Sequence, residues 1–346
     1  MDNKHNSAYW IIGAVSIIAL IAAVVVNIFI GNVGISMEEM LQFLSGNAEL
    51  SELKHIIISS RLNMTLTALL TGAALSVAGL LLQTLFSNPL ADPSVLGISS
   101  GANLGVAVCL LIIGATPTMV ASAGLSRQLW IALSSLLGAL PIILLLLYIS
   151  TKISNKLVVL IVGLMTSFIS SAVISVIEFF SMKESLYSYV LWGMGSFSSV
   201  PQSMIPFYFS VILLLLIACF LMIKPLNAIL LGDEYAENIG VNVYRSRTLI
   251  ILISSLLIAI VTAYCGPIGF IGLAIPHIVR FSLKKSDHRI VLPFSILWGG
   301  LFALLCLVIS RIPGIDGALP VNVITSIIGA PILIWILFQP SVKNLR

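Results

Sequence analysis

The sequence offers few residues whose types and spacing could support catalysis. Gly97-Ile-Ser99-Ser-Gly101 matches G-x-S-x-G, the pattern that presents a nucleophilic serine on a strand–turn–helix elbow in hydrolases. That serine needs a histidine and an acid as partners, and His277 is the only candidate base within an apolar segment. The match lies in a serine- and glycine-rich stretch that is expected to be helical. We therefore interpret it as a chance match and expect no serine hydrolase.

The other reactive side chains predict neither a metal centre nor a proton relay. His277 and His288 stand without neighbouring ligands and are expected to be structural. Glu178 is the one acid near an apolar span, at its outer end, where it reaches water. The absence of a series of acids argues against a proton-driven antiporter. Four cysteines form no C-x-x-C pair and are expected to be buried free thiols; they are Cys109, Cys219, Cys265 and Cys306.

The composition places these residues in a membrane. Only 9% of the 346 residues are charged and 59% are hydrophobic, whereas a soluble domain carries about a quarter charged residues. Apolar runs of about 20 residues, each able to cross ~30 Å of hydrocarbon, recur along the chain. The sequence predicts an all-α, polytopic membrane protein with one domain over residues 1–346. The ten expected spans are 9–30, 61–84, 95–114, 127–149, 156–180, 203–223, 247–265, 270–283, 291–310 and 323–339.

Basic residues predict how these helices are oriented. With the loops numbered alternately, twelve of the 17 Lys and Arg residues fall on the side of the termini and five on the other. The positive-inside rule then places both termini in the cytoplasm. The first span, Tyr9 to Ile30, is expected to be an uncleaved membrane helix. No basic run with interleaved aromatics occurs, so nucleic acid is not an expected partner.

The polar run FSNPLADPSVLGISSGANLGVA at 86–107 interrupts the apolar sequence on the cytoplasmic side. Pro89 and Pro93 cannot continue a helix, so the second span is expected to end near Phe86. Asp92 or Ser94 is expected to cap the third span. Glycines then recur every four residues on one predicted helical face, which favours close helix packing in lipid; they are Gly97, Gly101 and Gly105.

Two connecting loops carry short helical patterns. Outside, SMEEMLQFL opens with a capping box from Ser36 to Glu39 and predicts a helix on the outer surface. Inside, the loop at about 224–246 contains a short helix that begins with two acids, Asp233 and Glu234, and ends at Gly240. This helix is too short to span the membrane, and its apolar face fits a groove on another protein; that face is formed by Tyr235, Ala236 and Ile239.

Five stretches, in order along almost the whole chain, form a recognisable set. They are RLNMTLTALLTGAALSVAGLLLQTLFSNPLADPSVLGISSGANLG (61–105), LWGMGSF (191–197), LLGDEYAENIGVNVYRSR (230–247), GPIGFIGLAIPHIVRF (266–281) and LPVNVITSIIGAPILIWILF (319–338). Together they resemble the FecCD-type permeases, the membrane subunits of ABC importers for ferric siderophores, haem and vitamin B12. The resemblance implies a ten-helix subunit that pairs with a second permease copy, expected to form a homodimer, in the cytoplasmic (inner) membrane of a bacterium.

The resemblance also implies the partners. Two cytoplasmic ATPase subunits are expected below the paired permeases, and a substrate-binding protein is expected to dock outside. The chain has no G-x-x-x-x-G-K-[ST] sequence, so it has no P-loop of its own. We therefore expect that it binds no cofactor, that it is not an enzyme, and that ATP is used by the partner subunit.

Roles for single residues follow from the same resemblance. Asn88 and Leu90 match the family's cytoplasmic gate beneath the pathway. Arg61 and Arg311 match arginines that pair with acids on the two lobes of the binding protein, but Met64 stands where the family often has a second arginine. The cytoplasmic loop matches the segment that couples to the ATPase; its residues are Gly232, Asp233, Glu234, Ala236 and Gly240.

The expected function is therefore that of a permease subunit in an ATP-driven importer. A ferric siderophore is the first expected cargo, and haem or cobalamin is the alternative within the same class. The alternative from another class is a self-contained secondary transporter, which the nearly charge-free membrane interior disfavours.

Overall fold

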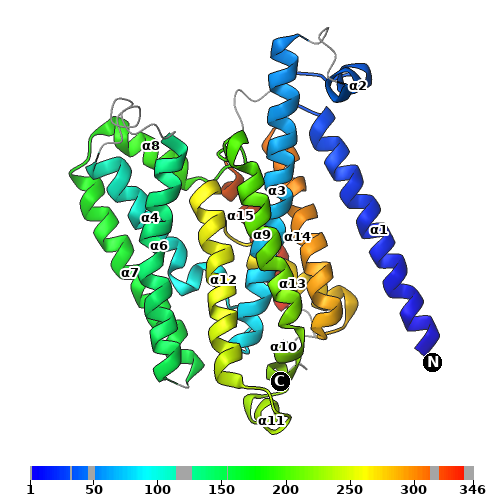
Figure 1. Cartoon of the computed structure of the whole chain (residues 1–346), viewed down its shortest axis with the longest axis vertical. Helices are drawn as coiled ribbons and strands as arrows, with labels where there is room; N and C mark the ends of the chain where they lie inside the picture. Colours follow the sequence, from blue (N-terminus) through cyan, green and yellow to red (C-terminus); the bar gives the residue numbers. More distant parts are fainter. Residues whose placement is uncertain are drawn as a thin grey trace.

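The computed structural model describes residues 2–31, 33–45, 51–113, 127–153, 155–311 and 319–338, and every regular element in these ranges is helical (Figure 1). The ten predicted spans all correspond to apolar helices, seven of them long enough to cross a membrane and three shorter. These helices are α1 (Asp2–Phe29), α3 (Glu52–Leu85), α4 (Ile98–Ala107), α6 (Arg127–Lys152), α7 (Lys156–Phe179), α9 (Ile205–Leu221), α12 (Val243–Cys265), α13 (Ile271–Leu283), α14 (His288–Ser310) and α15 (Val321–Leu337). The all-α, polytopic fold is thus confirmed.

Shorter helical pieces connect or extend the spans. They are α2 (Met37–Ser45), η1 (Pro93–Leu96), η2 (Val108–Ile112), α8 (Lys183–Gly193), η3 (Gln202–Met204), α10 (Ile223–Leu230) and α11 (Asp233–Asn238). The predicted outer helix is α2. Its capping box is formed, because the backbone N–H of Ser36 donates to Glu39 at 2.9 Å and the Glu39 N–H donates to Ser36 Oγ at 3.2 Å.

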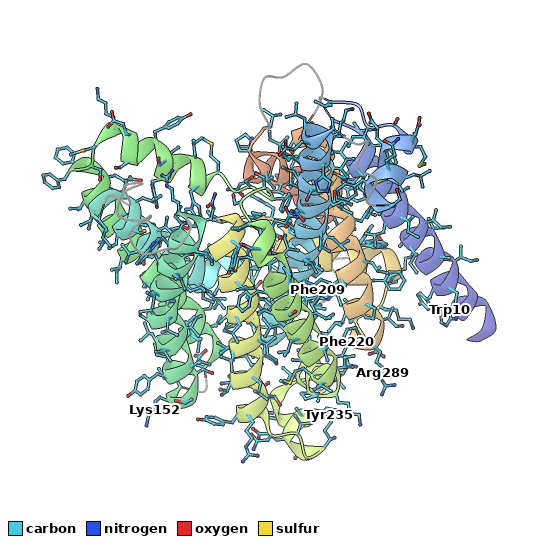
Figure 2. The ribbon with its side chains drawn as sticks, turned by 45° about the horizontal axis from the view of Figure 1, so that its top comes forward. Trp10, Lys152, Phe209, Phe220, Tyr235 and Arg289 are labelled. Carbon is cyan, nitrogen blue, oxygen red and sulfur yellow. The ribbon has the colours of Figure 1, made fainter. Side chains whose placement is uncertain are left out.

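The two ends of the bundle carry different elements. The start of α1 and helix α11 lie at one end, and α2 and α8 lie at the other (Figure 1). Lys152, Tyr235 and Arg289, from three predicted cytoplasmic loops, all lie toward the end that holds α11 (Figure 2). The arrangement agrees with the orientation that the basic residues predict, so we refer to the α11 end as the cytoplasmic end.

Helix α3 is the centre of the bundle. It packs against α12, α13 and α14, and 89% of its apolar stretch is buried, against 17% for α1 and α7. A second group, α4, α6 and α7, lies beside this core, and α12 contacts both α3 and α6. The apolar faces of α1 and α7 are left exposed, as expected of helices that face lipid or a second subunit.

The third span begins later than the sequence predicts. Asp92 accepts from the backbone N–H of Ser94 at 3.1 Å, but it caps the short turn η1 and not the membrane helix. Gly97 follows with φ of +75°, a left-handed conformation that ends η1 and that a residue without a Cβ adopts at low cost. The helix α4 starts only at Ile98, so Gly97 lies outside the helical face on which we predicted it.

A non-helical segment also separates α12 from α13. Helix α13 has 13 residues, a length of roughly 20 Å that cannot cross the hydrocarbon alone. The backbone around the break is satisfied from elsewhere, since the Gly269 N–H donates to Asn322 Oδ1 at 3.0 Å and the Ser196 N–H donates to the Cys265 carbonyl at 2.8 Å. Irregular backbone at membrane depth requires such partners.

Candidate functional site

The cytoplasmic loop is held in place by two ion pairs that share one carboxylate. The Asp233 carboxylate, at the start of α11, lies 2.9 Å from Lys156 Nζ and 3.3 Å from Arg247 Nη2. These basic residues begin α7 and lie in the first turns of α12, so one carboxylate joins three elements. Sequence reasoning selected Asp233 but missed both partners, because Lys156 is 77 residues away and no local pattern links them.

Two glycines shape the ends of this loop. Gly232 has φ of +113° and Gly240 has φ of +85°, and both conformations are disfavoured for residues with a Cβ. Within the described part of the chain, neither glycine has another heavy atom within 4 Å of the position that a Cβ would take. Their role in the structure is therefore to turn the backbone into and out of α11, and not to permit close packing.

The exposed face of α11 differs in part from the prediction. Tyr235 and Ile239 are about half exposed (49% and 54%), and Tyr235 projects at the cytoplasmic end (Figure 2). Glu234 is also exposed. Ala236, which we predicted on the apolar docking face, is instead fully buried against the chain's own bundle. The surface available to a partner is thus Tyr235, Ile239 and the acidic side chain beside them.

The predicted gate residues lie in a constrained turn after α3. The Asn88 N–H donates to the Gln83 carbonyl at 3.1 Å, and Asn88 Oδ1 accepts from the Leu90 N–H at 2.9 Å. Ser87 has φ of +49°, an unusual conformation for a residue that is not glycine. This turn leaves Leu90 48% exposed at the cytoplasmic end. An apolar side chain on a stiff turn has the chemistry that a constriction against ions requires.

Two of the three predicted glycines form a seam with α6. A Cβ on Gly101 would lie 2.6 Å from the Gly138 carbonyl oxygen, and one on Gly105 would overlap the Ser134 carbonyl. Gly97 belongs to another contact: a Cβ there would lie 2.6 Å from the Gly163 carbonyl of α7. The chain therefore uses small residues to bring α4 against both α6 and α7.

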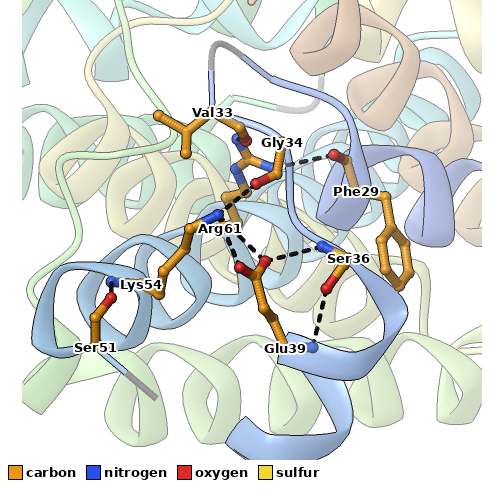
Figure 3. A network of polar contacts seen from close by, with 8 residues as sticks. All are labelled: Phe29, Val33, Gly34, Ser36, Glu39, Ser51, Lys54 and Arg61. Atoms are coloured by element: carbon orange, nitrogen blue, oxygen red, sulfur yellow. Dashed lines mark hydrogen bonds and ion pairs between the residues drawn. The ribbon is translucent and has the colours of Figure 1, made fainter. Parts of the chain in front are cut away.

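Arg61 is held by the end of α1. The residue is 6% exposed, and its guanidinium donates to the carbonyls of Ile28 (3.0 Å), Phe29 (3.2 Å) and Val33. Figure 3 shows Arg61 beside Phe29 and Val33. These carbonyls lie at and just beyond the end of α1, where a cation is favoured by the helix dipole. Arg61 therefore caps α1, and in this arrangement its charge is not free to pair with a binding protein.

Arg311 lies close to Arg61 at the same outer mouth. Both line a hollow of about 540 Å³ whose wall also includes Met194 and Phe197. Arg311 Nη2 lies 2.9 Å from the thioether of Met64, the residue that departs from the family pattern. Burial, and then the charge of Arg61, lower the pKa of Arg311 to about 10. The structure thus brings both predicted arginines to one hollow, and among the described residues Arg61 caps a helix whereas Arg311 contacts Met64.

The comparison with protein families decides the class. The family model described as the FecCD transport family matches residues 19–339. The chain belongs to the FecCD transport family. Vitamin B12 import system permease proteins (BtuC) of Salmonella typhi and of Salmonella newport are each 34% identical to it over 282 residues, which cover 81% of this chain and 83% of theirs.

Solved structures agree with this assignment. A structure described as an inward-facing conformation of a metal-chelate type ABC transporter superposes with a TM-score of 0.80 and 28% identity, covering 93% of this chain and 97% of that one. PsaBC from Streptococcus pneumoniae, solved with a Fab, has a TM-score of 0.55 and 17% identity over 88% of this chain and 98% of that chain. The second likeness shows the fold alone. This FecCD family member is thus a multi-pass membrane permease.

Proposed function

We propose that this protein is the membrane subunit of an ATP-driven importer that moves an iron chelate, a ferric siderophore, across the cytoplasmic membrane of a bacterium. The observation that supports it most strongly is the family match over almost the whole chain, joined to the close structural likeness to a metal-chelate transporter. Cobalamin is the second candidate cargo, because the relatives at 34% identity are vitamin B12 permeases.

We propose that the energy comes from a separate ATPase that docks on α11. The chain contains no P-loop sequence. Helix α11 offers two half-exposed apolar side chains, Tyr235 and Ile239, on a helix anchored to the bundle through Asp233. An apolar helix face inserted into a groove is a common docking mode. Movement of the ATPase would then pull on α7, α11 and α12 together, since the Asp233 ion pairs join all three.

The outer and inner ends are proposed to work in sequence. A loaded binding protein would dock over the outer hollow, where the charge of Arg311 steers its approach and orientation. The cargo would then cross between two copies of this chain, each of which exposes the apolar flank of α7. The turn with Asn88 and Leu90 would close the cytoplasmic end until the ATPase changes state. The gate residues, the pairing and the docking roles are parts of this proposal.

The test is to isolate the complex and to assay uptake. A tag on this chain, purified in detergent from its own host, should retain a second permease copy and two ATPase subunits in the native mass. The double variant Tyr235→Ala/Ile239→Ala should lose the ATPase, whereas Leu221→Ala, a change at a 78% exposed apolar residue of α9, should keep it.

The cargo is decided in cells that lack this chain. Uptake of an ⁵⁵Fe-loaded hydroxamate siderophore and of labelled cyanocobalamin should be compared after the gene is restored. Restored iron uptake alone supports the siderophore assignment, and restored cobalamin uptake alone replaces it with the second cargo. If the chain were purified without any nucleotide-binding partner and uptake in cells still depended on it, the secondary transporter would become the favoured function.

A further inference from the structure

A buried chain of polar side chains connects three helices at the cytoplasmic end. Asn227 of α10 accepts, through Oδ1, from both the backbone N–H (2.9 Å) and the ring Nδ1 (2.7 Å) of His288. The other ring nitrogen of His288, Nε2, lies 2.8 Å from Thr84 Oγ1 of α3. His288 is fully buried and Thr84 is 1% exposed. Buried polar groups of this kind are costly to leave unpaired, so the three side chains constrain one another.

Within this group of three side chains, the hydroxyl proton of Thr84 has two acceptors within reach. Asn227 Nδ2 donates to Asp287 at 2.6 Å, which orients the amide and leaves Oδ1 as an acceptor. His288 Nδ1 must then carry a proton, and in the neutral ring Nε2 is an acceptor. Thr84 Oγ1 has a single proton, and besides Nε2 it lies 2.9 Å from the Leu80 carbonyl of its own helix. The hydroxyl therefore has two alternative hydrogen-bonded states.

The polar chain of Thr84, His288 and Asn227 ends near two functional segments of the proposed importer. Thr84 lies in the last turn of α3, four residues before Asn88, and the carbonyl of its neighbour Gln83 holds the Asn88 N–H. At the other end, Asn227 lies on α10, which leads directly into α11 and the Asp233 ion pairs. The polar chain is thus a continuous contact path between the loop proposed to meet the ATPase and the turn proposed to gate the pathway.

The end of α3 is also held by α13. Gln83 Nε2 donates to the carbonyls of Gly272 and Leu273 at 3.2 Å each, and Gln83 Oε1 accepts from Arg280 at 2.7 Å. All three partners lie on α13, so this contact fixes the last turn of α3 to α13. A displacement of α10 that reaches Thr84 through His288 would then act on a turn whose neighbouring residue, Gln83, is held to α13.

We propose that Thr84, His288 and Asn227 are positioning residues that transmit movement of the α10–α11 segment to the gate turn at Asn88 and Leu90. This inference rests on the proposed function, because it assumes an ATPase at α11 and a gate at the turn. It adds a specific route between them that the family match does not supply. The Thr84 hydroxyl can donate to the Leu80 carbonyl or to His288 Nε2, and we assign the exchange between these two acceptors as the two-state element of this coupling.

The test reads the gate directly and needs no cargo. All four native cysteines are buried, so in a Leu90→Cys background a thiol reagent should label position 90 first. In the complex purified with its ATPase, labelling should be compared without nucleotide and with ATP. With the polar chain intact, we expect ATP to change the labelling rate at least about fivefold, the lower end of typical coupling between sites.

Thr84→Val, which keeps the shape and removes the hydroxyl, should reduce this ATP effect to less than about twofold while basal ATP hydrolysis and yield persist. Two controls should keep the full effect. Thr84→Ser retains the hydroxyl, and Thr67→Val removes another fully buried hydroxyl of α3, one without a hydrogen-bond partner among the described residues. Asn227→Leu interrupts the other end, and combined with Thr84→Val it should reduce the effect no further than either change alone.

The outcomes separate this inference from the proposed function. A full ATP effect in Thr84→Val, or losses in the double variant that multiply, would overturn the route through His288 while leaving the importer intact. A fall that tracks yield and ATP hydrolysis together would show a structural role only and would also overturn it. If the labelling rate at position 90 did not change with ATP even with the polar chain intact, the proposed coupling and gate would instead be wrong.

Discussion

The seam between α4 and α6 gives the sharpest stability prediction, the effect of Gly101→Ala. The new Cβ would lie 2.6 Å from the Gly138 carbonyl oxygen and 2.6 Å from the end of the Ile142 side chain. Ordinary contact begins at 3.4 Å, so the helices must separate by about 0.8 Å, because the opposing oxygen belongs to the backbone. Such overpacking costs about 3 kcal/mol. The higher helix propensity of alanine recovers about 1 kcal/mol, which leaves a net loss of about 2 kcal/mol.

A matched variant predicts the opposite sign. Gly193 ends α8, and no heavy atom of the described residues lies within 4 Å of the position that its Cβ would take, so Gly193→Ala should gain up to about 1 kcal/mol from helix propensity alone. At roughly 2 °C per kcal/mol for a chain of this size, Gly101→Ala should melt about 4 °C lower and Gly193→Ala up to about 2 °C higher.

The buried cysteines supply the assay for both variants. Each of the four is free and buried, so a thiol-reactive fluorescent dye reports unfolding of the detergent-solubilised protein as temperature rises. If Gly101→Ala raised the melting temperature as much as Gly193→Ala does, the two helices could not be in the close contact described, and the packing role of the glycines would have to be given up.

Asp233→Asn should weaken retention of the ATPase roughly five- to thirtyfold, because two partly exposed ion pairs contribute about 0.5–1 kcal/mol each to the placement of α11; Glu237→Gln on the same helix should leave retention unchanged. Hydrogen bonds from the Ser36 backbone and from Lys54 lower the pKa of Glu39. A carboxyl whose pKa is lower in the folded state stabilises the fold at pH above its unfolded-state value near 4.5, and this stabilisation is lost as the pH falls through the lower folded-state pKa. Amide exchange in α2 should therefore accelerate in that acidic window. The acceleration should be absent in Glu39→Gln. Arg61→Gln should lower stability by about 1–3 kcal/mol by removing the donor from partly buried carbonyls of Ile28 and Phe29, without changing affinity for the binding protein; weaker docking at an unchanged melting temperature would restore the docking role that the family resemblance implies.

The sequence was sufficient for the spans because a membrane helix is specified locally. Each apolar run must satisfy its backbone within itself, so length and composition alone locate it. The capping box of α2 is local in the same sense and was also predicted correctly. The start of α4 was not, because the turn η1 and the left-handed Gly97 carry the same serine and glycine residues as a continuous helix would.

The site was predicted less completely because its contacts are distant in sequence. An arginine at a helix mouth has the same sequence signal whether it faces a partner or caps a helix some 30 residues earlier, as Arg61 does. Ala236 is small enough to belong to either face of α11, and only the neighbouring helices decide that it is buried. The partners of Asp233 and the polar chain through His288 join residues 14 to 204 positions apart. No periodicity or motif within one segment could reveal them.

The contact between Met64 and Arg311 has an electrostatic consequence. Arg61 and Arg311 already share one hollow, and the thioether of Met64 lies 2.9 Å from the guanidinium of Arg311. A relative that carries arginine at the position of Met64 would crowd a third cation into the same space, at a cost in repulsion and desolvation. A chain with arginine at position 64 therefore needs an acidic group at this hollow to offset three cations, whereas this chain, with methionine there, needs to offset only two.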